Sequence, residues 1–198
     1  MKKIYDLFRL TRPANVLIAV LSVLLAAGLS GSLDPIHDVT LAVISAALVM
    51  MGSNIINDIY DINIDRINKP GRPIAAGSVT VQEAYYLFFA VNIIALICAF
   101  IISMMMMLIA LLVILLLVLY SSRFKRTVIW GNLVVSTCTA AAFIYGGLAV
   151  GRIDVVLFPA VFAFLFHFGR EIIKDIGLYR YPKTGELFSD SRIITPLM

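Results

Sequence analysis

The chain has 198 residues, of which 61% are hydrophobic and only 14% charged, with a mean hydropathy of +0.98. Ordinary soluble domains are about 45–50% apolar and about 25% charged, so this composition excludes them and indicates a polytopic membrane protein. The formal net charge of +4 does not indicate nucleic-acid binding. Basic residues concentrated in cytoplasmic loops explain the excess better.

Six apolar segments follow one another along the chain, which predicts an all-α, polytopic membrane helix bundle of about six transmembrane helices. Each approaches the roughly 20 residues that a helix needs to cross a bilayer. They are residues 13–31, 40–57, 81–102, 104–120, 128–150 and 155–169. A tight turn near Ser103 separates the third from the fourth. With a cytoplasmic N-terminus, every basic residue except Arg152 then lies on the inner side, as the positive-inside rule requires.

A polar run at residues 52–65 ends the second apolar segment. Asn57, Asp61 and Asp65 recur every four residues, so on a helix they form one polar stripe. Ionised side chains at membrane depth are costly unless they face a cavity, a partner or a cation. Because hard divalent cations prefer oxygen ligands, the stripe favours a metal site. The alternative is that Asp58, Asp61 and Asp65 only solvate a helix end.

The loop at residues 68–78 is rich in glycine and proline and follows this stripe directly. Pro70 and Pro73 restrict the backbone around Arg72, which could hold its guanidinium group over the stripe. A lid is one interpretation and a plain helix connection is the other. Thr80 and Glu83 predict a capping box at the start of the third segment.

Three loops, at residues 57–69, 123–126 and 170–175, deliver acids and bases to the same cytoplasmic end. Such a mixture suits a metal-bridged phosphate or diphosphate. In the last loop, the spacing of Arg170, Glu171, Lys174 and Asp175 slightly favours a surface salt-bridge ladder. The sequence contains no Walker loop and no Ser–His–Asp set, and His167 stands alone near a helix end.

The motif Asn57-Asp58-x-x-Asp61-x-x-x-Asp65 and the following loop resemble the first aspartate-rich motif of the UbiA-type intramembrane prenyltransferases. The run at residues 169–176 resembles the archaeal lipid branch, the geranylgeranylglyceryl phosphate geranylgeranyltransferases. This resemblance covers about residues 4–176. It divides the chain into an incomplete prenyltransferase membrane domain at 1–176 and a polar tail at 177–198.

The resemblance implies a nine-helix all-α fold with a central cavity. It implies an enzyme that binds a polyprenyl diphosphate through Mg²⁺, ionises it to an allylic cation and transfers the prenyl group to a prenylated glycerol phosphate. The implied partners are these two substrates and membrane lipids. We expect the protein to lie in the cell membrane, with its N-terminus and active site on the cytoplasmic side. The implied metal ligands are Asn57, Asp61 and Asp65. The implied catalytic residues are Asp61, Asp65 and Lys174, and the implied substrate-binding residues are Asn57, Arg72, Lys125, Arg170 and Asp175.

The sequence departs from the family after residue 176, where only Asp175 remains of the second aspartate-rich motif. The tail at 179–198 has no segment long enough to cross a bilayer, and we expect it to be disordered or interfacial. A truncated or frame-altered copy, a fragment and a divergent natural protein all remain open. Two other functions also remain open: an aromatic-acceptor prenyltransferase of quinone synthesis, and an inactive protein that binds prenyl diphosphate. A transporter is disfavoured, because transporters carry such acids near mid-membrane, whereas here the acids lie at one end of the bundle.

Overall fold

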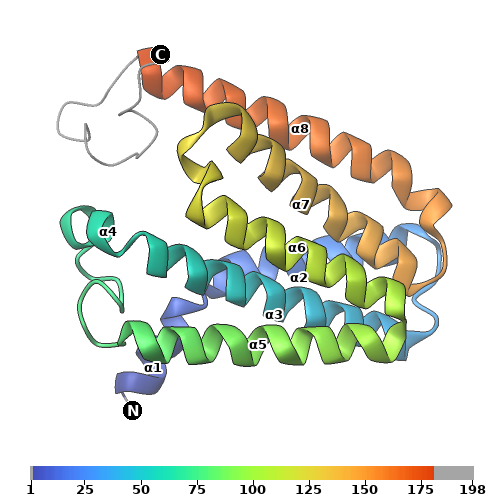
Figure 1. The fold of residues 1–198 in the computed structure, drawn as a ribbon. Coiled ribbons are helices and arrows are strands. Elements are labelled where there is room, and N and C mark those ends of the chain that lie inside the picture. Colours follow the sequence, from blue (N-terminus) through green and yellow to red (C-terminus); the bar gives the residue numbers. More distant parts are fainter. Residues whose placement is uncertain (1, 181–198) are drawn as a thin grey trace.

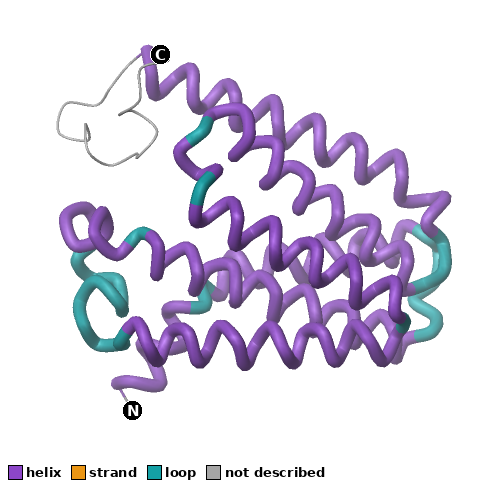
Figure 2. The backbone as a smooth tube through the Cα atoms, viewed as in Figure 1, coloured by secondary structure: helices purple, strands orange, loops and turns teal. Residues whose placement is uncertain are grey.

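The structure is a computed structural model that describes residues 2–180, with the side chains of residues 128 and 175–180 excepted. Most of the expected polar tail, residues 181–198, lies outside the described residues. The elements are α1 (Lys2–Leu10), α2 (Pro13–Leu29), α3 (Ile36–Tyr60), α4 (Ile62–Asn68), α5 (Val81–Ile102), α6 (Met104–Ser122), the 3₁₀ helix η1 (Phe124–Arg126), α7 (Val128–Ala149) and α8 (Ile153–Arg180). Between residues 2 and 180 the chain forms helices and loops without a strand (Figures 1 and 2).

The predicted all-α membrane bundle is confirmed. Five helices of the described chain are long and apolar enough to cross a membrane: α3, α5, α6, α7 and α8. A sixth span is obtained when α1 and α2, which meet at a bend of 48°, are taken together. Two features differ from expectation: α1 forms a separate helix before residue 13, and α8 continues past residue 169 to Arg180.

Local chemistry explains where the helices begin and end. Arg12 has a φ of 51°, which interrupts the helix, and Pro13 occupies the first turn of α2, where its missing N–H costs nothing. The predicted capping box is present: the Thr80 side chain accepts from the Glu83 N–H, and the Glu83 carboxylate accepts from the Thr80 N–H. The predicted turn at Ser103 is also present, with extended backbone and a side-chain oxygen that accepts from the Met106 N–H.

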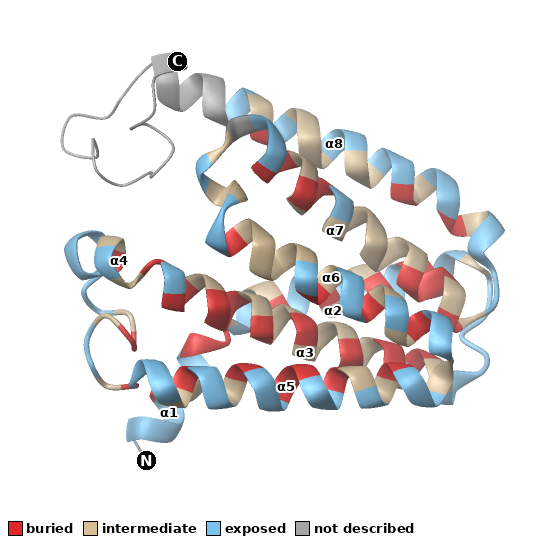
Figure 3. Cartoon of the chain, in the orientation of Figure 1, coloured by how far each residue is buried: buried red, intermediate tan, exposed pale blue. Residues whose placement is uncertain are grey.

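Helix α3 lies at the centre of the bundle, packed against α2, α5 and α6, while α7 packs against α2, α6 and α8. The contact between α2 and α7 is very close, because a Cβ atom on Gly146 would lie 2.4 Å from the Val23 carbonyl oxygen and 2.7 Å from Ala26 Cβ. Figure 3 shows buried residues along α3 and exposed ones along the outer sides of α5 and α8. The exposed side chains include large apolar ones such as Phe89 and Phe162, as expected of lipid-facing helices.

One end of the bundle gathers the polar segments. In Figure 1, α1, α4, the loop that follows α4 and η1 all lie at this end, together with the C-terminal end of α8. The short connections α2–α3, α5–α6 and α7–α8 lie at the opposite end. The three loops that the sequence predicts on one side of the membrane therefore do share one end, which we call the polar end.

Candidate functional site

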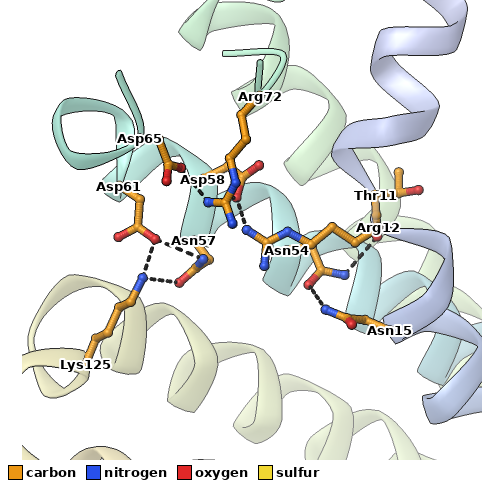
Figure 4. A network of polar contacts seen from close by, with 10 residues as sticks. All are labelled: Thr11, Arg12, Asn15, Asn54, Asn57, Asp58, Asp61, Asp65, Arg72 and Lys125. Carbon is orange, nitrogen blue, oxygen red and sulfur yellow. Dashed lines mark hydrogen bonds and ion pairs between the residues drawn. The ribbon is translucent and has the colours of Figure 1, made fainter. Parts of the chain in front are cut away.

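A buried carboxylate, Asp58, connects three segments at the polar end. Its side chain is only 4% exposed and forms ion pairs with Arg12, from the junction of α1 and α2, and with Arg72, from the loop after α4. The Arg72 Nη1 atom lies 3.1 Å from Asp58 Oδ1 and also donates to Asp65 (Figure 4). Arg72 thus joins the last turn of α3 to α4 and holds its own loop against both.

A second group joins α3 to η1. The Lys125 ammonium group donates to Asn57 Oδ1 over 3.1 Å and forms an ion pair with Asp61. Asn57 completes this group, because its Nδ2 atom donates to Asp61 Oδ2 over 3.1 Å (Figure 4). The amide and the carboxylate of the predicted stripe therefore point toward each other and toward the same base.

The residues of the predicted stripe keep their helical spacing although the helix that carries them is interrupted. Helix α3 ends at Tyr60, Asp61 has φ −90° and ψ 0°, and α4 begins at Ile62. The backbone N–H of Asp61 nevertheless donates to the Asn57 carbonyl, and that of Asp65 to the Asp61 carbonyl, over 3.0 and 2.8 Å. These bonds keep the four-residue repeat, so Asn57, Asp61 and Asp65 all line the same cavity.

This cavity has a volume of about 630 Å³ and lies between α2, α3, α6 and α7. Its walls are apolar along most of their length, with residues such as Ala19, Val49 and Val113. Charged and amide side chains collect at the polar end: Arg12, Asn54, Asn57, Asp61, Asp65, Lys69, Arg72, Lys125 and Lys174. The cavity therefore combines an ionic mouth with an apolar interior.

The loop after α4 is fixed at several points. Besides the two ion pairs of Arg72, the Arg9 guanidinium group donates to the Gly71 carbonyl over 3.2 Å, and Lys3 of α1 pairs with Glu83 at the start of α5. Helix α1 thus lies against the loop that the sequence analysis interprets as a lid. The contacts show how Arg72 is held over the cavity in this state.

The predicted site residues divide into two groups. Six of them line the cavity: Asn57, Asp61, Asp65, Arg72, Lys125 and Lys174. Arg170 is not a lining residue; its side chain is 60% exposed and donates to Glu171 over 2.7 Å. Lys174 also donates to Glu171, over 3.2 Å, so both bases contact one acid, which is buried. The side chain of Asp175 lies outside the described part of α8.

Sequence reasoning missed the roles of Arg12, Asp58 and Asn54. Asn54 donates to the Thr11 carbonyl over 2.8 Å and accepts from Asn15 over 3.0 Å, which fixes the start of α2 on α3. These contacts join residues 39 to 46 positions apart, so no local spacing reveals them. The available signal was Asp58 itself, an acid inside an apolar helix that needed a basic partner.

The side-chain oxygens of Asn57, Asp61 and Asp65 are of the kind that magnesium binds. Among the described residues, no three His, Cys, Asp or Glu side chains lie close enough to form a metal-binding group by themselves. Magnesium does not require such a group, because it is commonly held by one or two carboxylates together with waters and substrate phosphates. Asp61, Asp65 and the Asn57 amide oxygen line the cavity, where each accepts a hydrogen bond from Lys125 or Arg72.

Known proteins resemble this chain over most of its length. Residues 15–180 match the UbiA prenyltransferase family. A digeranylgeranylglyceryl phosphate synthase from Metallosphaera sedula is 40% identical over 151 residues, which are 75% of this chain and 53% of the relative. Across eight curated digeranylgeranylglyceryl phosphate synthases, this one included, the chain spans between 51% and 74% of the relative's length.

Two solved structures have the same fold. One is described as giving structural and mechanistic insights into the biosynthesis of digeranylgeranylglyceryl phosphate synthase in membranes. It is 28% identical with a TM-score of 0.85, and the match covers 96% of this chain and 73% of that chain. The other, a UbiA homologue from Archaeoglobus fulgidus bound to GPP and Mg²⁺, is 21% identical with a TM-score of 0.77. This match covers 94% of the present chain and 67% of the homologue's chain.

Proposed function

Because the chain belongs to the UbiA prenyltransferase family, we propose that it transfers a geranylgeranyl group from geranylgeranyl diphosphate to geranylgeranylglyceryl phosphate, a step of archaeal ether-lipid synthesis. The observation that carries this proposal is the cavity, whose ionic mouth suits a diphosphate and whose apolar interior suits an isoprenoid chain. The acceptor is proposed from the similarity to digeranylgeranylglyceryl phosphate synthases.

The charges at the mouth support binding of a diphosphate together with a cation. Three carboxylates, Asp58, Asp61 and Asp65, are paired with three bases, Arg12, Arg72 and Lys125. Lys69 and Lys174 also line the mouth, but these two bases do not offset the roughly three negative charges of a prenyl diphosphate, which would stay partly uncompensated in a partly buried site. Asn57, Asp61 and Asp65 would hold magnesium, which when bound supplies positive charge that offsets the diphosphate.

The bases of the chain have distinct proposed roles. Arg72 presents a planar fork of donors, which suits contact with phosphate oxygens, and its bonds to Asp58 and Asp65 fix its orientation beforehand. Lys125 and Lys174 line the same mouth and add positive charge there. Such fixed donors stabilise the charge that develops on a departing diphosphate.

The apolar walls have the complementary task. When the allylic C–O bond breaks, the prenyl group becomes a cation that water would capture. Walls such as Val49 and Val113 provide no donor or acceptor to hold water beside it. The acceptor hydroxyl then forms the new C–O bond and loses its proton, and diphosphate carries away the electron pair of the broken bond.

We also propose that the protein is a multi-pass cell-membrane protein with its polar end in the cytoplasm. The segments at that end carry Arg9, Arg12, Lys69, Arg72, Arg123, Lys125 and Arg126, whereas the α7–α8 connection at the other end carries Arg152. Basic loops are retained on the cytoplasmic side. Accessibility of cysteines introduced at Lys69 and at Ser32 to a membrane-impermeant reagent tests the orientation.

The test of the activity is direct. The purified chain in nanodiscs is incubated with geranylgeranyl diphosphate, geranylgeranylglyceryl phosphate and Mg²⁺, and diether product is measured by mass spectrometry. Product that disappears with EDTA supports the proposal. Prenylation of 4-hydroxybenzoate instead would assign an aromatic acceptor, and tight diphosphate binding without product would show a binding protein. Either result overturns the proposed reaction.

A further inference from the structure

A tyrosine lines the end of the cavity opposite its ionic mouth. Tyr145 of α7 lines the cavity, is only 5% exposed, and its hydroxyl donates to the Ser45 hydroxyl of α3 over 2.9 Å. Ser45 is fully buried and donates in turn to the Ala95 carbonyl of α5 over 3.0 Å. This relay of two hydrogen bonds fixes the phenol ring across three helices.

The bundle beyond Tyr145 is filled. Tyr145 packs in a cluster of buried residues from five helices, whose members include Val23, Ala27, Ala42 and Ala149. The neighbouring Gly146 has no room for even a Cβ atom against α2. Because α2 and α7 touch at this level, the cavity has no continuation past the tyrosine between these two helices. We call Tyr145 and Ser45 the floor.

The depth of the cavity follows from the continuous helix α3, which carries both Ser45 of the floor and Asn57 of the mouth. Twelve residues separate them, and an α-helix rises 1.5 Å per residue, so the depth is roughly 18 Å. An extended chain advances about 1.2 Å per covalent bond, so an isoprene unit of four backbone bonds spans about 5 Å. Four units would span about 20 Å when fully extended, so the cavity is deep enough for about four units if the chain bends slightly.

We propose that Tyr145, held by Ser45, is a specificity-determining residue that limits the bound prenyl diphosphate to four isoprene units. This inference rests on the proposed function, since it assumes that the diphosphate lies at the mouth. A fifth unit has no space below the floor. Each buried methylene group raises affinity about fourfold. A five-unit chain that meets the floor must leave some of its carbons unburied or move its diphosphate from the mouth, so we expect it to bind more weakly than a four-unit chain.

The experiment measures the affinity of the chain for a series of prenyl diphosphates with two to five isoprene units, in nanodiscs with Mg²⁺ and without acceptor. For the parent protein we expect affinity to rise up to four units and then to fall. In Tyr145→Ala the five-unit compound should gain about tenfold relative to the four-unit one, because the fifth unit enters the vacated space. Tyr145→Phe keeps the ring and should leave the length profile unchanged.

Two further variants separate the floor from general stability. Met106→Ala truncates a side chain of the same buried cluster that does not line the cavity, so it should destabilise the protein without changing the length profile. Ala142→Phe fills the cavity three residues above Tyr145, about 4.5 Å along α7. It should move the optimum from four units to three, and it provides the test even where Tyr145→Ala fails to fold.

The outcomes are distinguishable. If no compound of the series binds the parent protein, the proposed function itself fails. If all lengths bind the parent equally, the chain leaves the cavity sideways into lipid and the floor does not limit it. If the compounds bind but Ala142→Phe and Tyr145→Ala leave the optimum at four units, Tyr145 serves only to join the helices and the inference is overturned.

Discussion

Asp61 allows the metal interpretation to be separated from a purely structural role of the stripe. Its side chain is 12% exposed and contacts Lys125 and Asn57. The substitution Asp61→Asn keeps the size of the side chain and an acceptor oxygen but removes the charge. If Asp61 binds magnesium in the diphosphate complex, the lost charge stabilisation is worth several kcal/mol, which lowers affinity about a hundredfold or more.

The expected cost to folding is smaller. In Asp61→Asn, Lys125 keeps its bond to Asn57 Oδ1, and its side chain is 22% exposed, so water reaches the uncompensated charge. We expect the free energy of unfolding to fall by about 1–2 kcal/mol, less than the 3–5 kcal/mol of a fully buried pair that loses one partner. Binding should therefore suffer clearly more than stability.

Binding of geranylgeranyl diphosphate is measured by calorimetry in nanodiscs over a series of Mg²⁺ concentrations, and stability by thermal unfolding. The matched control is Asp6→Asn, since Asp6 is also a buried acid paired with a base, Arg9, but does not line the cavity. Asp6→Asn should leave the Mg²⁺ dependence of binding intact. If Asp61→Asn binds the diphosphate as tightly as the parent at equal Mg²⁺, the stripe is not a metal site.

Two other variants test the scaffold of the site. Arg72→Lys replaces a planar fork by a single ammonium group that cannot keep the contacts to Asp58 and Asp65 in the same geometry, so diphosphate affinity should fall about tenfold; calorimetry showing unchanged affinity would contradict the role of the fork. Gly146→Ala forces α2 and α7 apart and should lower the free energy of unfolding by about 1–3 kcal/mol in denaturant titrations. Gly28→Ala, where a Cβ atom meets nothing within 4 Å, is its control, and equal losses in both variants would refute the packing argument.

The helices were largely predictable because membrane spans are long and their ends carry local signals. The capping box at Thr80 and the turn at Ser103 depend on residues within three positions of each other, so the sequence displays them. The separate helix α1 was not predicted. The local signal for its end is Pro13, which disfavours helical backbone at Arg12, whereas the contact of Arg12 with Asp58, 46 residues away, follows no local pattern.

The candidate site was predictable in its acids and less so in its bases. Asn57, Asp61 and Asp65 share a face because helical spacing requires it, and the hydrogen bonds through Asp61 preserve that spacing. Which base pairs with which acid depends on how the loop after α4 and η1 fold back over α3. Arg170, expected at the site, instead has an exposed side chain that contacts its own neighbour, the buried Glu171.

The continuity of α3 has a consequence for how proteins of this architecture could change during evolution. Ser45 and Asn57 belong to one rigid rod, so a single inserted residue between them would turn the mouth relative to the floor by about 100°. Gradual lengthening of the cavity by insertion is thereby blocked, since every intermediate misdirects the acids. The accessible path to a different reach is to exchange side chains at the far end, which leaves the headgroup chemistry untouched.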